Sequence, residues 1–512
     1  MDEALNHAPG SESMRDAEGL LPVELAALHQ QKDVLAALLK RDVRGSFATF
    51  KDFLKDFPKD FTTVLDLSKR TPPLGPRNAE LLSGLLLVHG EGCHKLNLSG
   101  QNLQASGSKA LAKALKSGMA ELKNCNLLRN NLDIESAMML AKIGTEKGIL
   151  LSGMERDETE ADFSDQSLQT ADAILIASDL QFVAVLTNLD LSDNYNIGDD
   201  GAKAIADALK VSPVLTSLEL RSNSIGDDGA KAIAEALKVN PVLTELNLWN
   251  NSIGPEGAKA IAEALKVNAV LTKLNVGYNL LDEQAALGIV RAARRQDKIT
   301  FLGLGRCGIG PIGAKEIADF IQFTAVLTKL DLAINSIGDD GAKAIAEALK
   351  VSPVLTSLEL RSNSIGDDGA KAIAEALKVN PVLKNCNLLR NNLNIESATM
   401  LAKIGTEKGI MLSGGSGPNG DQNLQPADGI LIGSDLQFMA VLTSLDFTRL
   451  KQLKQSAFSS GISDDGAKAI AEALKVNPVL TKLNLMYNKL GEAGRKAVRD
   501  AVKDRSGFVL KL

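Results

Sequence analysis

Aromatic residues are scarce in this sequence, at 4% of 512 residues, and include one Trp and three Tyr. Its core must therefore come mainly from the aliphatic part of the 45% of residues that are hydrophobic. Cysteine is rare too, and no C-x-x-C pair or nearby His has ligand spacing, which argues against a disulfide scaffold or a zinc site. We expect core thiols in a reducing compartment, the cytoplasm or nucleus, at Cys93, Cys125, Cys307 and Cys386.

Neither sign of charge dominates, because 57 basic residues face 63 acidic ones and the net charge is −6. This balance gives no general attraction for nucleic acid or an anionic membrane. The polar stretch 1–19 lacks the apolar core of a signal peptide, and no run approaches 18 apolar residues. We therefore expect neither secretion nor a membrane span.

Motifs for catalysis are also missing. The sequence has no G-x-x-x-x-G-K-[ST], H-E-x-x-H or G-x-S-x-G, and its four histidines all lie in the first fifth of the chain. Gly303–Gly308 satisfies G-x-G-x-x-G, but its residues fall in register with the repeat described next, and no acidic ribose partner follows in the expected context. We expect no cofactor, no metal and no enzymatic activity.

An internal repeat is what the sequence does contain. Its clearest unit, residues 215–242, starts again at Leu243, 28 residues later. The first half has the spacing L-x-x-L-x-L-x-x-N-x-I, which predicts a short strand with Leu218 and Leu220 on one face. The second half, residues 227–239, has apolar residues at helical spacing. One strand and one helix cannot bury a core alone, so the repeats must stack.

An asparagine recurs where each predicted strand ends. Its side-chain amide can satisfy backbone groups that the turn leaves unpaired, so stacked repeats predict a structural asparagine ladder. The ladder positions are Asn130, Asn194, Asn223, Asn251, Asn279, Asn335, Asn363, Asn391 and Asn488, with Cys307 replacing one Asn.

The repeats can be followed across most of the chain. We count 15, of which those near 150–158 and 411–414 are slipped, and expect their strands to form one sheet. Residues 61–506 are the predicted solenoid, residues 1–19 a disordered N-terminus, residues 20–60 a helical cap with weak ankyrin-like character, and residues 507–512 a closing strand.

Large blocks have been copied within the solenoid. Residues 212–243 recur identically at 352–383, and residues 122–153 recur nearly unchanged at 383–414. Three insertions break the pattern, at 153–162, 413–423 and 448–461. Each is a loop on a rigid scaffold, where function often resides, and each is equally explained as tolerated slack.

The pattern resembles the ribonuclease-inhibitor-like class of leucine-rich repeats, also found in NOD-like receptors and Ran GTPase-activating proteins. This resemblance implies a right-handed α/β horseshoe solenoid, with a parallel sheet on the concave face and helices on the convex face. The segment Leu191–Asn194 looks like the loop that carries a functional Asn in Ran GTPase-activating proteins, and Asn194 would be that residue.

The concave face is the candidate binding surface. Its central column is acidic or amide-bearing and contains no Lys or Arg, which favours a basic partner; the alternative is that Asp and Asn are ordinary solvated strand residues. The column includes Asp190, Glu219, Asn247, Asn275, Asp331 and Glu359, and beside it lie Arg221, Trp249, Tyr278, Arg306 and Arg361. Trp, Tyr and Arg are enriched among interface hot spots.

These observations favour a non-catalytic protein-interaction scaffold of regulatory type. Two alternatives remain: a GTPase-activating protein for a Ran-like small GTPase, and an innate-immune sensing module without the ATPase domain of NOD-like receptors. The expected partner is a protein, either a basic one or a small GTPase, and not nucleic acid or a membrane.

Overall fold

The computed structural model describes residues 64–89, 92–117, 119–414, 424–439, 441–447 and 461–512. The predicted disordered N-terminus and helical cap lie outside the described residues, as do most of the insertions 413–423 and 448–461. The chain divides into two compact units between Leu243 and Thr244.

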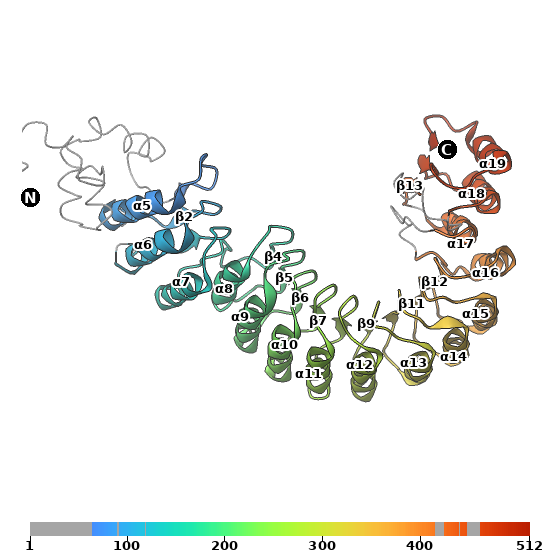
Figure 1. The fold of residues 1–512 in the computed structure, drawn as a ribbon, viewed down its shortest axis with the longest axis horizontal. Coiled ribbons are helices and arrows are strands. Elements are labelled where there is room, and N and C mark those ends of the chain that lie inside the picture. Colours follow the sequence, from blue (N-terminus) through green and yellow to red (C-terminus); the bar gives the residue numbers. More distant parts are fainter. Residues whose placement is uncertain (1–63, 90–91, 118, 415–423, 440, 448–460) are drawn as a thin grey trace, which may run out of the picture. The chain divides into compact units, whose positions relative to one another are not determined.

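In the first unit, short strands alternate with helices along the chain, with the strands on one side and the helices on the other (Figure 1). Its elements are β1 (Val64–Asp66), α5 (Gly75–His89), β2 (Lys95–Asn97), α6 (Gln104–Ser117), β3 (Asn124–Asn126), α7 (Ile134–Lys147), β4 (Glu160–Asp162), α8 (Thr170–Asp179), β5 (Asn188–Asp190), α9 (Gly198–Val211), β6 (Ser217–Glu219) and α10 (Asp227–Val239).

The second unit alternates in the same way except after Lys408, where the described residues form a further α-helix and a 3-10 helix before the next strand. Its elements are β7 (Glu245–Asn247), α11 (Pro255–Leu265), β8 (Lys273–Asn275), α12 (Glu283–Gln296), β9 (Phe301–Gly303), α13 (Pro311–Phe323), β10 (Lys329–Asp331), α14 (Gly338–Val351), β11 (Ser357–Glu359), α15 (Asp367–Val379), β12 (Asn385–Asn387), α16 (Ile395–Lys408), α17 (Asp428–Asp435), the 3-10 helix η4 (Leu436–Phe438), β13 (Ser444–Asp446), α18 (Asp464–Val476), β14 (Lys482–Asn484), α19 (Glu492–Val502) and β15 (Val509–Lys511).

A regular repeat buries the middle residue of its strand and one face of its helix. In β6 the middle residue, Leu218, is buried, and α10 buries Ala230, Ile233, Ala234 and Leu237. The alternation of strand and helix matches the predicted fold class, an α/β solenoid with parallel strands.

The strands pair in parallel register, but not as one sheet. In the first unit, β1, β2 and β3 form one ladder, and β4, β5 and β6 form another. In the second unit, β7 to β12 form a ladder separate from β13, β14 and β15. The expectation of one sheet is therefore wrong at the two slipped repeats. The closing strand at the C-terminal end is present as β15, which pairs with β14.

A buried aspartate closes the ladder at each break. Beyond β3, Leu150 forms only an isolated bridge with Asn124, and the carboxylate of Asp179 accepts the N–H groups of Leu151 (2.7 Å) and Ser152 (2.7 Å). Asp179 is 0% exposed. It thus takes the place of the next strand as the hydrogen-bond acceptor.

The copied block repeats this closure beyond β12. Met411 bridges Asn385, and Asp435 accepts the N–H groups of Leu412 (2.7 Å) and Ser413 (2.6 Å). Among the described residues, no strand follows between this point and α17, whereas the first copy has β4.

Candidate functional site

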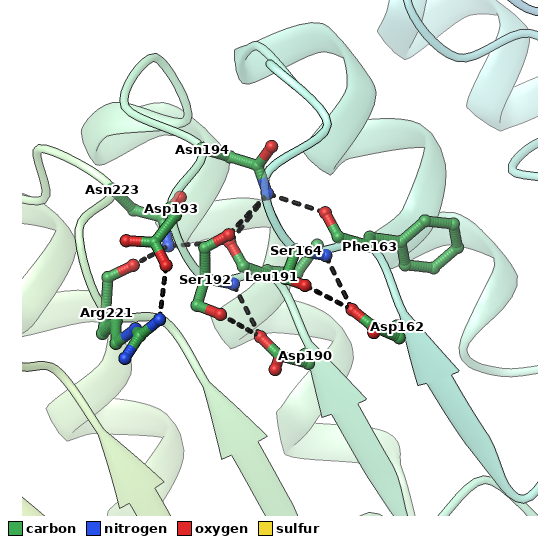
Figure 2. Close-up of polar contacts among 10 residues, drawn as sticks. All are labelled: Asp162, Phe163, Ser164, Asp190, Leu191, Ser192, Asp193, Asn194, Arg221 and Asn223. Atoms are coloured by element: carbon green, nitrogen blue, oxygen red, sulfur yellow. Dashed lines mark hydrogen bonds and ion pairs between the residues drawn. The ribbon is translucent and has the colours of Figure 1, made fainter. Parts of the chain in front are cut away.

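The central-column side chains cap the ends of their own strands. In the first unit, Asp162 accepts the N–H of Ser164 at 2.9 Å, and Asp190 accepts that of Ser192 at 2.8 Å (Figure 2). In the second unit, Asn275 and Asp331 accept the N–H two residues further on in the same way. The role requires an acceptor that both Asp and Asn supply, which explains why Lys and Arg are missing from the column.

The ladder asparagines lie under the turns that follow the strands. The amide nitrogen of Asn194 donates to the carbonyl oxygens of Phe163 and Leu191, both at 2.9 Å (Figure 2). Its oxygen accepts the N–H of Leu168 at 2.9 Å. The other predicted positions donate similarly to backbone carbonyls: Asn130, Asn223, Asn251, Asn279, Asn335, Asn363, Asn391 and Asn488.

Asn194 is poorly placed for the role that the resemblance to Ran GTPase-activating proteins implies. Its side chain is 0% exposed, and both ends of the amide are engaged with backbone groups. A residue that contacts a bound GTPase needs an accessible polar group. The geometry of Asn194 gives that role no support.

The predicted partner-binding residues divide between the two units. Asp190 and Glu219 lie side by side in register on β5 and β6 of the first unit. Arg221 follows β6 and is exposed, but its guanidinium forms an ion pair with Asp193 at 2.5 Å (Figure 2). The sequence did not reveal this ion pair. Because Asp193 partly neutralises the Arg221 guanidinium, Arg221 offers less positive charge to a partner.

In the second unit, Trp249 and Tyr278 form an aromatic pair. Their ring centroids are 4.7 Å apart and the ring planes are tilted by 46°. Both side chains are half-buried rather than fully exposed. The rings therefore support each other while part of each faces solvent.

Charged residues extend this aromatic pair along the strand face. A side chain added at Gly305 would lie 3.3 Å from the Tyr278 ring and 3.6 Å from the Asp331 carboxylate, so the ring and the carboxylate flank this glycine. Asp331 is in register with Glu359 on the next strand. We call Trp249, Tyr278, Asp331, Glu359 and Arg361 the aromatic–charged strip.

Burial changes the titration of this strip. It raises the pKa of the Glu359 carboxyl to about 7, although Asn387 donates a hydrogen bond to it, and it raises the pKa of Asp331 and of the Tyr278 hydroxyl. The charges of Arg361, Arg390 and Arg306 act on Tyr278 in the opposite direction. Asn247 and Asn275 complete the predicted set as half-buried strand residues.

The glycines of the G-x-G-x-x-G segment have packing roles. A side chain at Gly303 would collide with the Asn275 amide. Cys307 is buried, its N–H donates to the ladder residue Asn335 at 3.0 Å, and burial raises the pKa of its thiol to about 12. These contacts explain the segment without a phosphate group.

Reactive groups are few in the described part of the chain. The four cysteines are free and buried. No group of three or more His, Cys, Asp or Glu side chains there could hold a metal ion. Of the helices that the structure describes, none has both the length and the apolar character that a membrane crossing requires.

A second asparagine ladder, which the sequence reasoning missed, lies at the C-terminal ends of helices. The amide nitrogen of Asn240 donates to the carbonyl of Leu209 at 2.7 Å, and its oxygen accepts the N–H of Leu243 at 2.8 Å. Asn380 and Asn477 repeat the arrangement. The signal in the sequence is the recurring Val-Asn-Pro-Val that follows these helices.

Comparison with known proteins agrees with this architecture. A family model described as a leucine-rich repeat matches residues 184–206, 211–234, 239–262, 325–346, 351–374 and 476–498. The protein is a leucine-rich-repeat solenoid. No curated protein matches the sequence of this repeat protein.

Solved structures similar to the leucine-rich-repeat chain have low sequence identity. The yeast Rad7 and Elc1 complex contains a chain 16% identical, with 74% of this chain and 88% of that chain covered and a TM-score of 0.46. An internalin from Listeria monocytogenes is also 16% identical, with 72% and 92% covered and a TM-score of 0.37. The C-terminal domain of tropomodulin from Caenorhabditis elegans is 12% identical, with 37% and 90% covered and a TM-score of 0.23.

Proposed function

We propose that this leucine-rich-repeat protein is a non-catalytic scaffold that binds a partner protein through the aromatic–charged strip of its second unit. The observation that carries the proposal is the Trp249–Tyr278 pair, because two large rings remain partly open to solvent on a strand face. Side chains of this kind dominate binding energy at protein interfaces.

The charges around the pair favour a partner with groups of both signs. Asp331 and Glu359 are adjacent in register, and Arg306 and Arg361 lie close enough to act on Tyr278. A basic group on the partner would relieve the repulsion between the two carboxylates, which contributes to the raised pKa of Glu359. The arginines would accept an acidic group or stack on an aromatic one.

The scaffold proposal is also supported by the low reactivity of the cysteine thiols that the structure describes. The thiols of Cys125, Cys307 and Cys386 are buried, and burial raises their pKa, so they are poor nucleophiles. Buried free thiols fit a reducing compartment, and we place the protein in the cytoplasm or nucleus.

The test compares capture of proteins from source cells by the intact chain and by Trp249→Ala. We expect at least one protein to be retained by the wild type and lost by the variant, with an affinity decrease of about 2 kcal/mol or more once the isolated partner is titrated. Because Trp249 packs on Tyr278, a small decrease in thermal stability should accompany this loss.

A matched control is Lys371→Ala, which changes an exposed residue of α15 and leaves the strand face intact. It should retain the same proteins as the wild type. Identical retention by Trp249→Ala and the wild type would exclude the aromatic–charged strip as the main docking surface.

A further inference from the structure

The first break leaves β4 with one open edge. β4 pairs with β5 on one side, and among the described residues no strand pairs with its other side. In a regular repeat, both Thr216 and Ser217 donate their N–H groups to the carbonyl of Thr187 in the preceding repeat, at 2.9 and 3.0 Å.

The equivalent groups of β4 are the N–H groups of Thr159 and Glu160. Within the described ranges, neither has a hydrogen-bond partner. The preceding chain segment pairs with β3 instead, where its carbonyls at Leu150 and Leu151 accept the N–H groups of Cys125 and Leu127. An open strand edge is a template for pairing with another chain.

A cavity lies beside this edge. Its volume is about 240 Å³. Its lining includes Asn126 of β3 and Arg129 just after it, Gly153 and Met154 of the insertion, and Ala161 and Asp162 of β4. Gly153 has φ +86°, and a side chain there would come within 2.5 Å of the Asn126 amide nitrogen. The sheet therefore opens at this point, and the chain that turns away does not fill the gap.

The border of the cavity on the β4 side is acidic. Glu158 and Asp162 line it, and Glu160 is exposed between them on the strand. Hydrogen bonds from Ser164 lower the pKa of Asp162, so this carboxylate stays charged. Among the residues that line the cavity, Arg129 is the basic one. Nearby Glu155 forms an ion pair with Lys95.

We propose that the open edge of β4 is a binding site for an extended peptide segment with basic side chains, contributed by a partner protein. The peptide backbone would bond to the N–H groups of Thr159 and Glu160, as an added strand does. Its basic side chains, on alternate residues, would face Glu160 and Asp162. This site lies in the first unit and does not depend on the aromatic–charged strip.

The experiment uses the full chain and a labelled synthetic peptide of alternating Lys and Val, with blocked ends. We expect saturable binding in fluorescence anisotropy, and slower amide hydrogen exchange at residues 159–162 when the peptide is present. Glu160→Lys should weaken binding by about tenfold or more. Glu146→Lys, the same charge change on the exposed face of α7, should leave the affinity within about twofold.

A second peptide of the same sequence, N-methylated at alternate residues, separates strand pairing from simple charge attraction. It keeps every charge, but its methyl groups prevent the close approach of two backbones that strand pairing requires, so we expect its binding to be lost. Equal affinity for the two peptides, an equal effect of Glu146→Lys, or no binding of the unmodified peptide would each overturn the proposal.

Discussion

Asn194 is enclosed by backbone groups of two successive repeats. Its amide bonds to carbonyls on both sides and accepts N–H groups of Gln166 and Leu168. Asn196, two residues further on, is exposed. The same residue type thus has a structural role at one position and faces solvent at the other.

We predict that Asn194→Ala lowers the free energy of unfolding by about 1 to 3 kcal/mol, because it leaves buried backbone groups without partners. Asn196→Ala should change it by less than about 0.5 kcal/mol. Urea denaturation followed by circular dichroism measures both. Equal midpoints for the two variants would contradict a structural role for the ladder.

The buried carboxyl group of Asp179 makes the stability of the folded protein depend on pH. Burial raises its pKa to about 7, against an ordinary value of 3.8, although Ser152 and Leu151 donate hydrogen bonds to it. Between these two values the folded protein holds a proton that the unfolded chain has released. Its contribution to stability is therefore complete below about pH 4 and is lost as the pH rises through about 7.

Asp179→Asn cannot ionise, so this contribution should disappear from the pH profile. We expect the decrease in unfolding free energy between about pH 5 and about pH 8 to shrink by on the order of 2 kcal/mol. Asp157→Asn, at an exposed position of the same unit, is the control and should keep the wild-type slope. A full slope in Asp179→Asn would show that this carboxylate does not titrate in the range.

At the scale of the element, helix starts are tied to the preceding repeat. The Asp199 carboxylate in α9 accepts the N–H groups of Gly226 (2.7 Å) and Gly229 (2.8 Å) at the start of α10. A side chain at Gly229 would lie 2.8 Å from the same oxygen. Position 229 requires glycine because the Asp199 carboxylate lies too close for a side chain, and not because of the backbone angles there.

Two glycine-to-alanine changes should therefore have opposite signs. Gly229→Ala should destabilise the protein by about 1 to 3 kcal/mol, because neighbouring atoms must move. Gly288→Ala lies within α12, where the nearest atom to an added side chain is 4.0 Å away, and should stabilise by about 0.5 to 1 kcal/mol through helix propensity. Thermal unfolding of both variants tests this, and a shared sign would refute the packing argument.

The positions of regular elements could be predicted because the period is strong. The repeat at 215–242 gave a strand and a helix that the structure places at Ser217–Glu219 and Asp227–Val239. The sequence located the two slipped repeats but could not show that the sheet breaks there, since Asp179 and Asp435 appear in sequence only as polar residues at the ends of apolar helices. Their partners, more than 20 residues away, are set by tertiary packing.

For the candidate site, the sequence predicted which residues lie on the surface but not which side chains contact each other. Trp249 and Tyr278 were predicted to lie on one surface, and their rings do contact each other. It could not show that Asp193 pairs with Arg221, or that column carboxylates cap strand ends. Such pairings depend on side-chain directions that a repeat pattern does not specify.

At the scale of the whole molecule, the buried-aspartate closures bear on how such a chain can grow. A copied segment whose last strand does not pair with the next repeat needs another acceptor for the N–H groups of that strand. After the copied blocks 122–153 and 383–414, the two copies continue into similar helices, α8 and α17, whose last residues are the closing carboxylates Asp179 and Asp435. Each copy thus carries the acceptor that ends its own ladder, so gene duplication can copy the end of a ladder together with the strands that lead to it.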